Sequence, residues 1–241
     1  GERVFIDPTS QSDINHYVSR NSPEGHDEKS NFNCQLKENS ALSPKQSPLI
    51  NRVSARGPAD ALRTYRIAIA TTGEYAQLFG GTKSDALSSV VTTVNRLNQV
   101  FERDLSVRLE LVNGNDQLLY TSPISDPYSN EDASAMVEEN IVNINTVIGK
   151  ENYDIGHVFG TGNTGGLAFL SSACGTYKAG GVTGSNSPTG EAFNIDYVAH
   201  EIGHQLGASH TFNGHQLNCS AGNRAAETAV EPGSGSSIMG Y

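Results

Sequence analysis

The stretch "VAHEIGHQLGASH" holds three of the seven histidines of this 241-residue chain. His200 and His204 are four positions apart, so on a helix their imidazoles lie side by side on one face. This spacing suits two ligands of one tetrahedral zinc ion, and Glu201 is placed to move a proton from an attacking water to a leaving amine. Gly207 can end the helix in a left-handed conformation, which lets His210 return to the same ion. Three protein ligands leave the fourth position open, as a catalytic zinc requires.

The segment "FNIDYVAHEIGHQLG", residues 193–207, is expected to form the helix that carries the first two histidines. Its apolar stripe consists of Ile195, Val198, Ile202 and Leu206. A histidine on an apolar face is usually a packed core residue, and a bare HExxH pattern also occurs by chance. The third histidine and the glycine at the required spacing favour the zinc site. The other histidines lack such a pattern and are expected to be structural or surface residues, with His157 inside a strand.

Hydrophobic periodicity predicts the elements that must position this helix. Apolar or alternating segments predict strands at 64–72, 106–112 and 153–160, and amphipathic segments predict helices at 82–105 and 129–150. Thr82 or Ser84 is expected to cap the first helix and Ser129 or Asn130 the second, with a turn at Gly73. Strands that alternate with long helices predict a mostly parallel sheet. The glycine-rich stretch 160–190 lacks the phosphate-loop pattern and is expected to form loops and a hairpin at the sheet edge.

Composition limits the partners. The net charge is −10 and the isoelectric point about 5.1, which disfavours nucleic acid and anionic membrane surfaces as partners. No apolar run is long enough for a membrane helix, and the chain opens without the basic start and apolar region of a signal peptide. Because it begins with Gly1, a signal peptide could have been removed. Residues 1–60 are polar and proline-rich, so we expect them to be extended and either disordered or draped over the domain that follows.

The pattern HExxHxxGxxH resembles that of the metzincin metalloproteases, and "GSSIMGY" supplies Met239 for the methionine turn beneath their metal site. Within the metzincins the sequence is most similar to the reprolysin-like (adamalysin-like) group, especially its secreted bacterial members. The resemblance covers residues 64–241 and implies an α/β (α+β) fold. That fold has a twisted, mostly parallel sheet, two long helices, an active-site helix and a short irregular lower subdomain. It also implies a secreted, monomeric zinc endopeptidase acting on polypeptides. Residues 61–241 would be its catalytic domain, truncated after the methionine turn.

The same resemblance assigns further residues to the substrate cleft. The segment "GGLAFL" would be the edge strand that pairs antiparallel with a bound peptide, through Gly166, Leu167, Ala168, Phe169 and Leu170. Two positions depart from the animal and venom reprolysins, which usually have Asp where this chain has Thr211 and which lack a tyrosine at the position of Tyr241. Astacins and serralysins have that tyrosine as a metal ligand and oxyanion donor. Tyr241 is expected either to take that role or to form a wall of the cleft.

The cysteines suggest how such an enzyme would be restrained. Many metzincin zymogens use a prodomain cysteine whose thiolate takes the open zinc position, and Cys34 is the unpaired thiol if Cys174 joins Cys219. Residues 1–60 would then be the tail of a prodomain or a linker, acting as an internal inhibitor, with Arg52, Arg56 and Arg63 as cleavage points. The alternatives are a disulfide from Cys34 to Cys174 or Cys219, or a surface thiol.

Two other functions compete with the endopeptidase. The first is a catalytically silent protein with the same metal site, either a latent zymogen or a zinc-dependent peptide-binding module. The second is a zinc hydrolase of small molecules. The intact Glu201 disfavours permanent loss of activity, and an open cleft with a peptide-pairing strand favours a polypeptide substrate.

Overall fold

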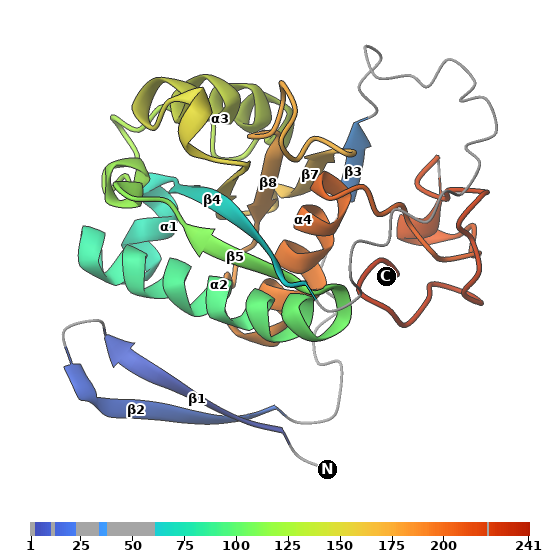
Figure 1. The fold of residues 1–241 in the computed structure, drawn as a ribbon, viewed down its shortest axis with the longest axis horizontal. Helices are drawn as coiled ribbons and strands as arrows, with labels where there is room; N and C mark the ends of the chain where they lie inside the picture. Colours follow the sequence, from blue (N-terminus) through green and yellow to red (C-terminus); the bar gives the residue numbers. More distant parts are fainter. Residues whose placement is uncertain (1–2, 11–12, 23–33, 38–60, 221) are drawn as a thin grey trace.

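The computed structural model describes residues 3–10, 13–22, 34–37, 61–220 and 222–241. Its main sheet has six strands in the spatial order β3-β7-β8-β6-β4-β5 (Figure 1). Their bounds are β3 Cys34–Lys37, β7 Gly165–Phe169, β8 Gly181–Gly184, β6 Ile155–Gly160, β4 Arg63–Thr71 and β5 Val107–Leu111. Neighbouring strands are parallel except for β7 and β8, which pair antiparallel. The expected mostly parallel sheet with a hairpin-like pair near its edge is therefore confirmed.

The sheet separates two apolar layers. On one face Ile67 and Ile69 of β4 pack with α2 (Lys83–Leu105), and on the other Ala68 and Ala70 pack with α3 (Ala133–Val147) (Figure 1). Alternation along β4 produces this division, because successive side chains of a strand point to opposite faces. The segment that carries the histidine pair packs on the α2 side, so the sheet and α2 together set its position.

N-cap side chains determine the first residue of α2 and of α3. The Thr82 side chain accepts a hydrogen bond from the Asp85 backbone N–H and caps α2, as predicted. The cap of α3 is Asp132, which corrects the expected Ser129 or Asn130. Both of those side chains are engaged elsewhere: Ser129 donates to Glu139, and Asn130 contacts threonines outside α3.

Other local predictions need correction. A short helix, α1 (Gly73–Leu78), begins where a turn was expected, because the Thr72 side chain caps it. The predicted helix over 193–207 is two helices, a π-helical segment η3 (Ala192–Ala199) followed directly by α4 (His200–Gln205). Three short 3-10 turns, η1 (Asn115–Leu118), η2 (Lys150–Asn152) and η4 (Leu217–Cys219), complete the helical elements among the described residues.

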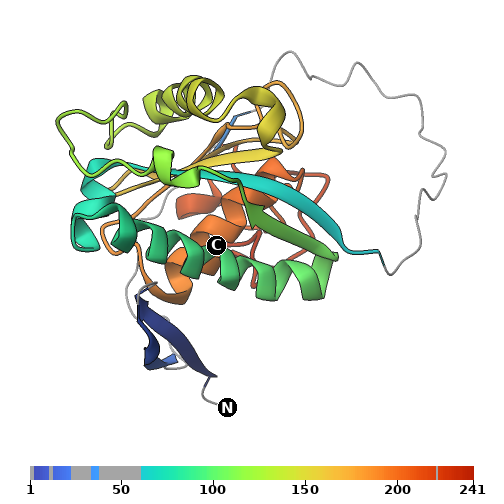
Figure 2. The same cartoon turned by 60° about the vertical axis from the view of Figure 1, so that its left-hand side comes forward.

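The N-terminal segment is extended where the structure describes it. Strands β1 (Arg3–Ser10) and β2 (Asp13–Ser22) form an antiparallel pair beside α2, and β3 joins the main sheet (Figures 1 and 2). Arg52 and Arg56 lie outside the described residues. Arg63 opens β4, where its N–H donates to the Ser106 carbonyl at 2.9 Å. Cleavage after Arg63 would therefore cut inside a paired strand.

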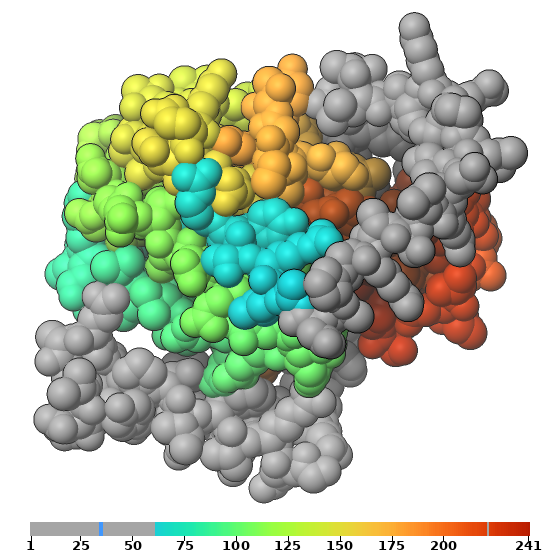
Figure 3. All heavy atoms as spheres, viewed as in Figure 1, coloured from blue at the N-terminus to red at the C-terminus, as the bar shows by residue number. Residues whose placement is uncertain are grey.

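The residues that follow α4 gather at one side of the molecule as an irregular segment (Figures 1 and 3). Apart from η4, the described residues of this segment contain turns and one isolated bridge, between Phe212 and Glu231, which agrees with the expected short irregular lower subdomain. Among the described residues, no helix combines the length and the apolar character needed to cross a membrane.

Candidate metal centre

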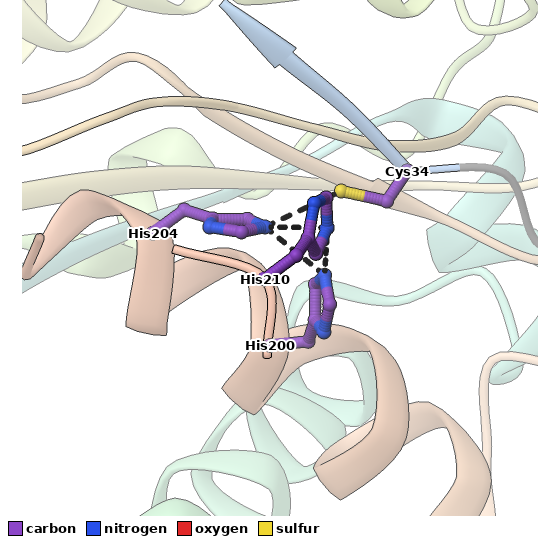
Figure 4. Close-up of side chains that lie close together, drawn as sticks. All are labelled: Cys34, His200, His204 and His210. Atoms are coloured by element: carbon purple, nitrogen blue, oxygen red, sulfur yellow. Dashed lines mark hydrogen bonds between the residues drawn. The ribbon is translucent and has the colours of Figure 1, made fainter. Parts of the chain in front are cut away.

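The ends of α4 bring the three histidines together. His200 and His204 project from one face of α4, and Gly207 follows with a φ of +105°, a conformation that side chains other than glycine rarely adopt. The Ala208 N–H then donates to the Gly203 carbonyl at 2.9 Å and closes the helix end. The chain turns back, and His210 faces the pair on α4 (Figure 4).

The ring nitrogens of these histidines converge on one point. The Nε2 atoms of His200 and His204 are 3.0 Å apart, and each is 3.2 Å from Nε2 of His210. A tetrahedral zinc ion with Zn–N bonds of 2.0–2.1 Å places its nitrogen ligands about 3.3 Å apart. The observed triangle is therefore close to the size that such an ion requires.

The hydrogen bonds of the Nδ1 atoms determine the tautomer of each imidazole ring. Nδ1 of His200 donates to the Ile238 carbonyl and Nδ1 of His204 to the Ala208 carbonyl, both at 2.7 Å. Nδ1 of His210 donates to the Asn223 carbonyl at 2.5 Å. Burial lowers the pKa of all three imidazoles, so they are neutral at pH 7. With the only proton on Nδ1, three Nε2 lone pairs face one another, and a cation is the partner that satisfies them together.

Cys34 supplies a fourth donor from the first strand of the sheet. Its Sγ lies 3.5 Å from Nε2 of His204, and the four donor atoms are all within 4.8 Å of one another (Figure 4). A zinc ion bound to one sulfur at about 2.3 Å and to imidazole nitrogens gives a similar sulfur–nitrogen separation of about 3.5 Å. Cys34, Cys174 and Cys219 are all free thiols, and Cys34 is buried. The alternatives of a disulfide or a surface thiol for Cys34 are thus wrong, and so is the considered pairing of Cys174 with Cys219.

Glu201 lies beside this donor set and is fully buried. Among the described residues neither of its carboxylate oxygens has a hydrogen-bond partner, and burial raises its pKa to about 8. Burial also raises the pKa of Cys34, and the Glu201 carboxylate raises it further. Two buried acidic groups side by side are costly unless a cation offsets their charge. This donor set, with imidazole and thiolate ligands, fits a zinc ion.

Tyr241 lies beside His210, and Met239 packs against α4 at Gly203. The Tyr241 hydroxyl is 3.5 Å from Nε2 of His210 and 3.5 Å from the Cys34 carbonyl oxygen. Its ring lies 5.0 Å from that of Phe212, which in turn packs 4.9 Å from the His210 ring. Met239 packs under α4 so closely that a Cβ on Gly203 would lie 2.7 Å from its sulfur. The glycine of "HEIGH" permits this close approach, and a larger residue there would push the Met239 side chain aside.

Strand β7 is not the outermost strand of the sheet, because β3 from the N-terminal segment lies beyond it. The pairing of β7 with a substrate stays a prediction. Cys34 pairs with Gly166 and Lys37 with Phe169, so β3 covers β7 in a parallel orientation, whereas Leu170 lies in the turn after β7. The open N–H and C=O groups of an edge strand accept any extended backbone, and here the chain's own segment takes that place. A peptide bound antiparallel at β7 would have to displace β3.

Several residues that hold the site were missed in the sequence. His157 is buried in β6, as predicted, but its Nδ1 donates to Gln205 Oε1 at 2.9 Å and its Nε2 accepts from the Thr183 hydroxyl at 2.8 Å. Gln205 in turn donates to the Gly156 carbonyl at 2.9 Å. The network ties α4 to β6 and β8 directly behind His204. The only sign of this network in the sequence is Gln205, a polar residue directly after the ligand His204.

Replacing His157 with glutamine is expected to change how stability depends on pH. Burial lowers the pKa of His157 to about 4, below its ordinary 6.5. As the pH falls from 6.5 to about 4, the unfolded chain binds a proton that the folded chain does not, so stability is lost in that window. The loss is about 1.4 kcal/mol per pH unit, or about 3 kcal/mol in all. At pH 7 the variant should be less stable by about 1–3 kcal/mol.

The measurement is urea unfolding of the zinc-free wild type and His157→Gln across this pH range. We expect the stability difference between the two proteins to shrink as the pH falls, because the variant lacks the histidine's proton linkage. Two curves that stay parallel would show that His157 does not titrate in this way.

Fold and site together define a class of protein: an α/β domain whose last helix presents a His-Glu-x-x-His pair, with a third histidine after a glycine turn and a methionine beneath. The chain belongs to the metallo-peptidase family M12B, reprolysin-like, whose sequence profile matches residues 61–241. The predicted family is thus confirmed.

Individual proteins are similar over parts of their length. The chain is 40% identical over 62 residues to human disintegrin and metalloproteinase domain-containing protein 9, which covers 26% of this chain and 7% of that protein. Among solved structures, myroilysin matches 79% of this chain and 56% of its own, at 16% identity and a TM-score of 0.36. Metalloproteinase-II from Bacteroides fragilis matches 68% and 50%, at 16% identity and a TM-score of 0.40. The chain thus spans at most about half the length of these proteins.

Proposed function

We propose that this chain is a secreted, monomeric zinc endopeptidase in a latent form, in which Cys34 closes the metal site. The observation that carries the proposal is the convergence of three neutral imidazole nitrogens and one thiol sulfur. Membership of the metallopeptidase family supports a polypeptide as substrate. Residues 61–241 would form the catalytic domain, and residues 1–60 the tail of its inhibitory prodomain.

His200, His204 and His210 would hold the ion, which when bound supplies a Lewis acid that polarises the peptide carbonyl and lowers the pKa of a water. Glu201 would be ionised in spite of its burial, because the bound cation favours the charged form. Glu201 would then accept the proton of the attacking water and deliver it to the leaving amine nitrogen as the C–N bond breaks. Its burial beside the ligands, with no hydrogen-bond partner among the described residues, leaves both oxygens available for this transfer. The Tyr241 hydroxyl, 3.5 Å from Nε2 of His210, would donate a hydrogen bond to the oxyanion.

Two contacts would keep the enzyme latent. The Cys34 thiolate would be the fourth ligand, so that no water could take that position. Strand β3 would also cover the backbone groups of Gly166, Leu167, Ala168 and Phe169 that a substrate needs. Because β3 runs parallel to β7, a substrate that binds antiparallel would meet the metal with its backbone in the opposite direction. Release of residues 1–60 would uncover both contacts at once.

Removal of the metal tests this function. In Cys34→Ala the metal would no longer hold the four-residue strand β3 in place, so a substrate could displace it from β7. This variant is expected to cleave an unfolded polypeptide such as reduced casein. A zinc chelator should abolish cleavage, and added zinc should restore it, because the Lewis acid is required. Cleavage that persists in verified zinc-free protein would contradict the proposal. A zinc-loaded variant that hydrolyses only small esters would favour the small-molecule hydrolase, and one that binds peptides without cleaving them would favour the peptide-binding module.

A further inference from the structure

Glu231 lies in the irregular segment after α4, and its carboxylate is surrounded by hydrogen-bond donors. Oε2 accepts from the backbone N–H of Ser236 at 2.7 Å and from that of Ser237 at 3.1 Å. Oε1 accepts from the Ser237 hydroxyl at 2.5 Å. These hydrogen bonds lower the pKa of Glu231 to about 2, so the group is ionised at neutral pH. A carboxylate that holds two successive backbone N–H groups fixes the path of the chain between them.

The segment held in this way leads directly into the metal site. The residue after Ser237 is Ile238, whose carbonyl accepts the proton of His200 Nδ1 at 2.7 Å. The Gly240 N–H donates to the Ser237 carbonyl at 2.9 Å, and the Tyr241 N–H donates to the Ser234 carbonyl at 2.6 Å. The carboxylate therefore orders the turn from which both the His200 acceptor and Tyr241 emerge.

The backbone of Glu231 also connects this turn to the third histidine. Its N–H donates to the Thr211 carbonyl at 2.9 Å, and the Thr211 N–H donates to the Met239 carbonyl at 3.2 Å. Thr211 follows His210 directly in the chain. Glu231 is thus bonded both to the irregular segment that carries His210 and to the turn that supports His200.

We propose that Glu231 is a positioning residue of the metal centre, which sets the orientation of His200 by holding the Ser236–Ser237 turn against the irregular segment after His210. The inference rests on the proposed function, since it concerns how the same ligands are held. It assigns a role to a residue that neither contacts the ligands nor belongs to the HExxHxxGxxH pattern. Its effect passes through backbone groups that support a ligand, and such outer contacts typically change metal affinity by about 10–100-fold.

The test compares Glu231→Gln with Glu227→Gln, a substitution of an exposed glutamate in the same segment. Glutamine keeps the size of the side chain, but its NH2 group cannot accept the N–H and O–H donors that now meet the carboxylate. The zinc dissociation constant of each 241-residue variant would be measured by competition with a chromophoric chelator. We expect Glu231→Gln to bind zinc about 10–100-fold more weakly than wild type, and Glu227→Gln to bind it as wild type does. The visible absorption bands of the cobalt-substituted proteins should change for Glu231→Gln alone.

Equal zinc affinity and equal cobalt spectra for the folded Glu231→Gln and wild-type proteins would overturn the inference. If Glu231→Gln does not fold, the zinc dissociation constants of Glu231→Asp and Ser237→Ala are measured instead. Wild-type zinc affinity in both variants would also overturn the inference. Circular dichroism of the metal-free proteins separates a local change from a loss of fold. A wild-type chain that binds no zinc would contradict the proposed function, whereas a zinc-binding wild type matched by Glu231→Gln contradicts this inference alone.

Discussion

Replacement of Glu201 by glutamine is expected to abolish peptide hydrolysis while zinc stays bound. Glutamine fills the same buried space and leaves His200 and His204 on the same helix face, so the ligands are unchanged. It cannot accept the proton of an attacking water, and general acid–base catalysis of this kind contributes about 10²–10⁴-fold. We therefore expect kcat/KM to fall by about 10³-fold.

The measurement uses Cys34→Ala as the background, so that latency does not hide the effect. Zinc content would be determined on the same samples as kcat/KM, and Glu227→Gln would serve as the matched control at an exposed position. A zinc-loaded Glu201→Gln variant that retains most of its activity would assign the proton transfer to another group. Loss of zinc from that variant would instead show that Glu201 supports the ligands.

Replacement of Cys34 by alanine has the second large expected effect, in the opposite direction. The Cys34 sulfur is the donor nearest His204 after the other histidines, and its removal leaves three imidazoles and an open position. If the thiolate closes the site in at least nine-tenths of the molecules, activity toward a polypeptide should rise by about tenfold or more. Zinc should remain bound, because three histidines suffice for a catalytic site.

Cys174→Ala provides the control, since Cys174 is a free but exposed cysteine that is not among the four clustered donors. It should leave the protein latent. If folded, zinc-loaded Cys34→Ala is no more active than wild type, the Cys34 thiol does not cause latency. Strand β3 would then be the remaining candidate for the block, because its backbone pairing with β7 does not depend on the side chain of Cys34.

Much of the fold could be predicted because its elements follow side-chain periodicity. The strands β4, β5 and β6 and the helix α2 could be predicted, since their apolar residues recur at the spacing of the element. The cap of α2, Thr82, is one of the two residues that the sequence offered, the other being Ser84. The cap of α3 was misplaced because several residues before it have capping side chains. Which one caps depends on the tertiary partners of the others, such as Glu139 for Ser129.

The site could be predicted only in part, for a related reason. The spacing of His200, His204 and His210 can be read from the sequence and predicts the three ligands. The turn at Gly207 is expected because glycine readily adopts a positive φ. The carbonyls that orient the imidazoles belong to Ile238, Ala208 and Asn223. Every residue has a carbonyl group, so no residue type marks these positions in a sequence. They depend on how the chain returns to the site after α4.

Strand β3 could not be predicted for a similar reason. Its four residues, "CQLK", show no alternation strong enough to mark a strand, and their pairing with β7 depends on backbone groups alone. The same holds for Glu231, whose carboxylate meets its donors only after residues 232–237 fold around it.

X-ray absorption at the zinc edge of the zinc-loaded 241-residue chain tests the central claim most directly. The claim is that His200, His204, His210 and Cys34 bind one zinc ion in the latent form. The predicted shell has three nitrogens at about 2.0–2.1 Å and one sulfur at about 2.3 Å, and the sulfur should disappear in Cys34→Ala. A wild-type shell without sulfur would contradict latency through Cys34, and a protein that binds no zinc at these residues would contradict the account as a whole.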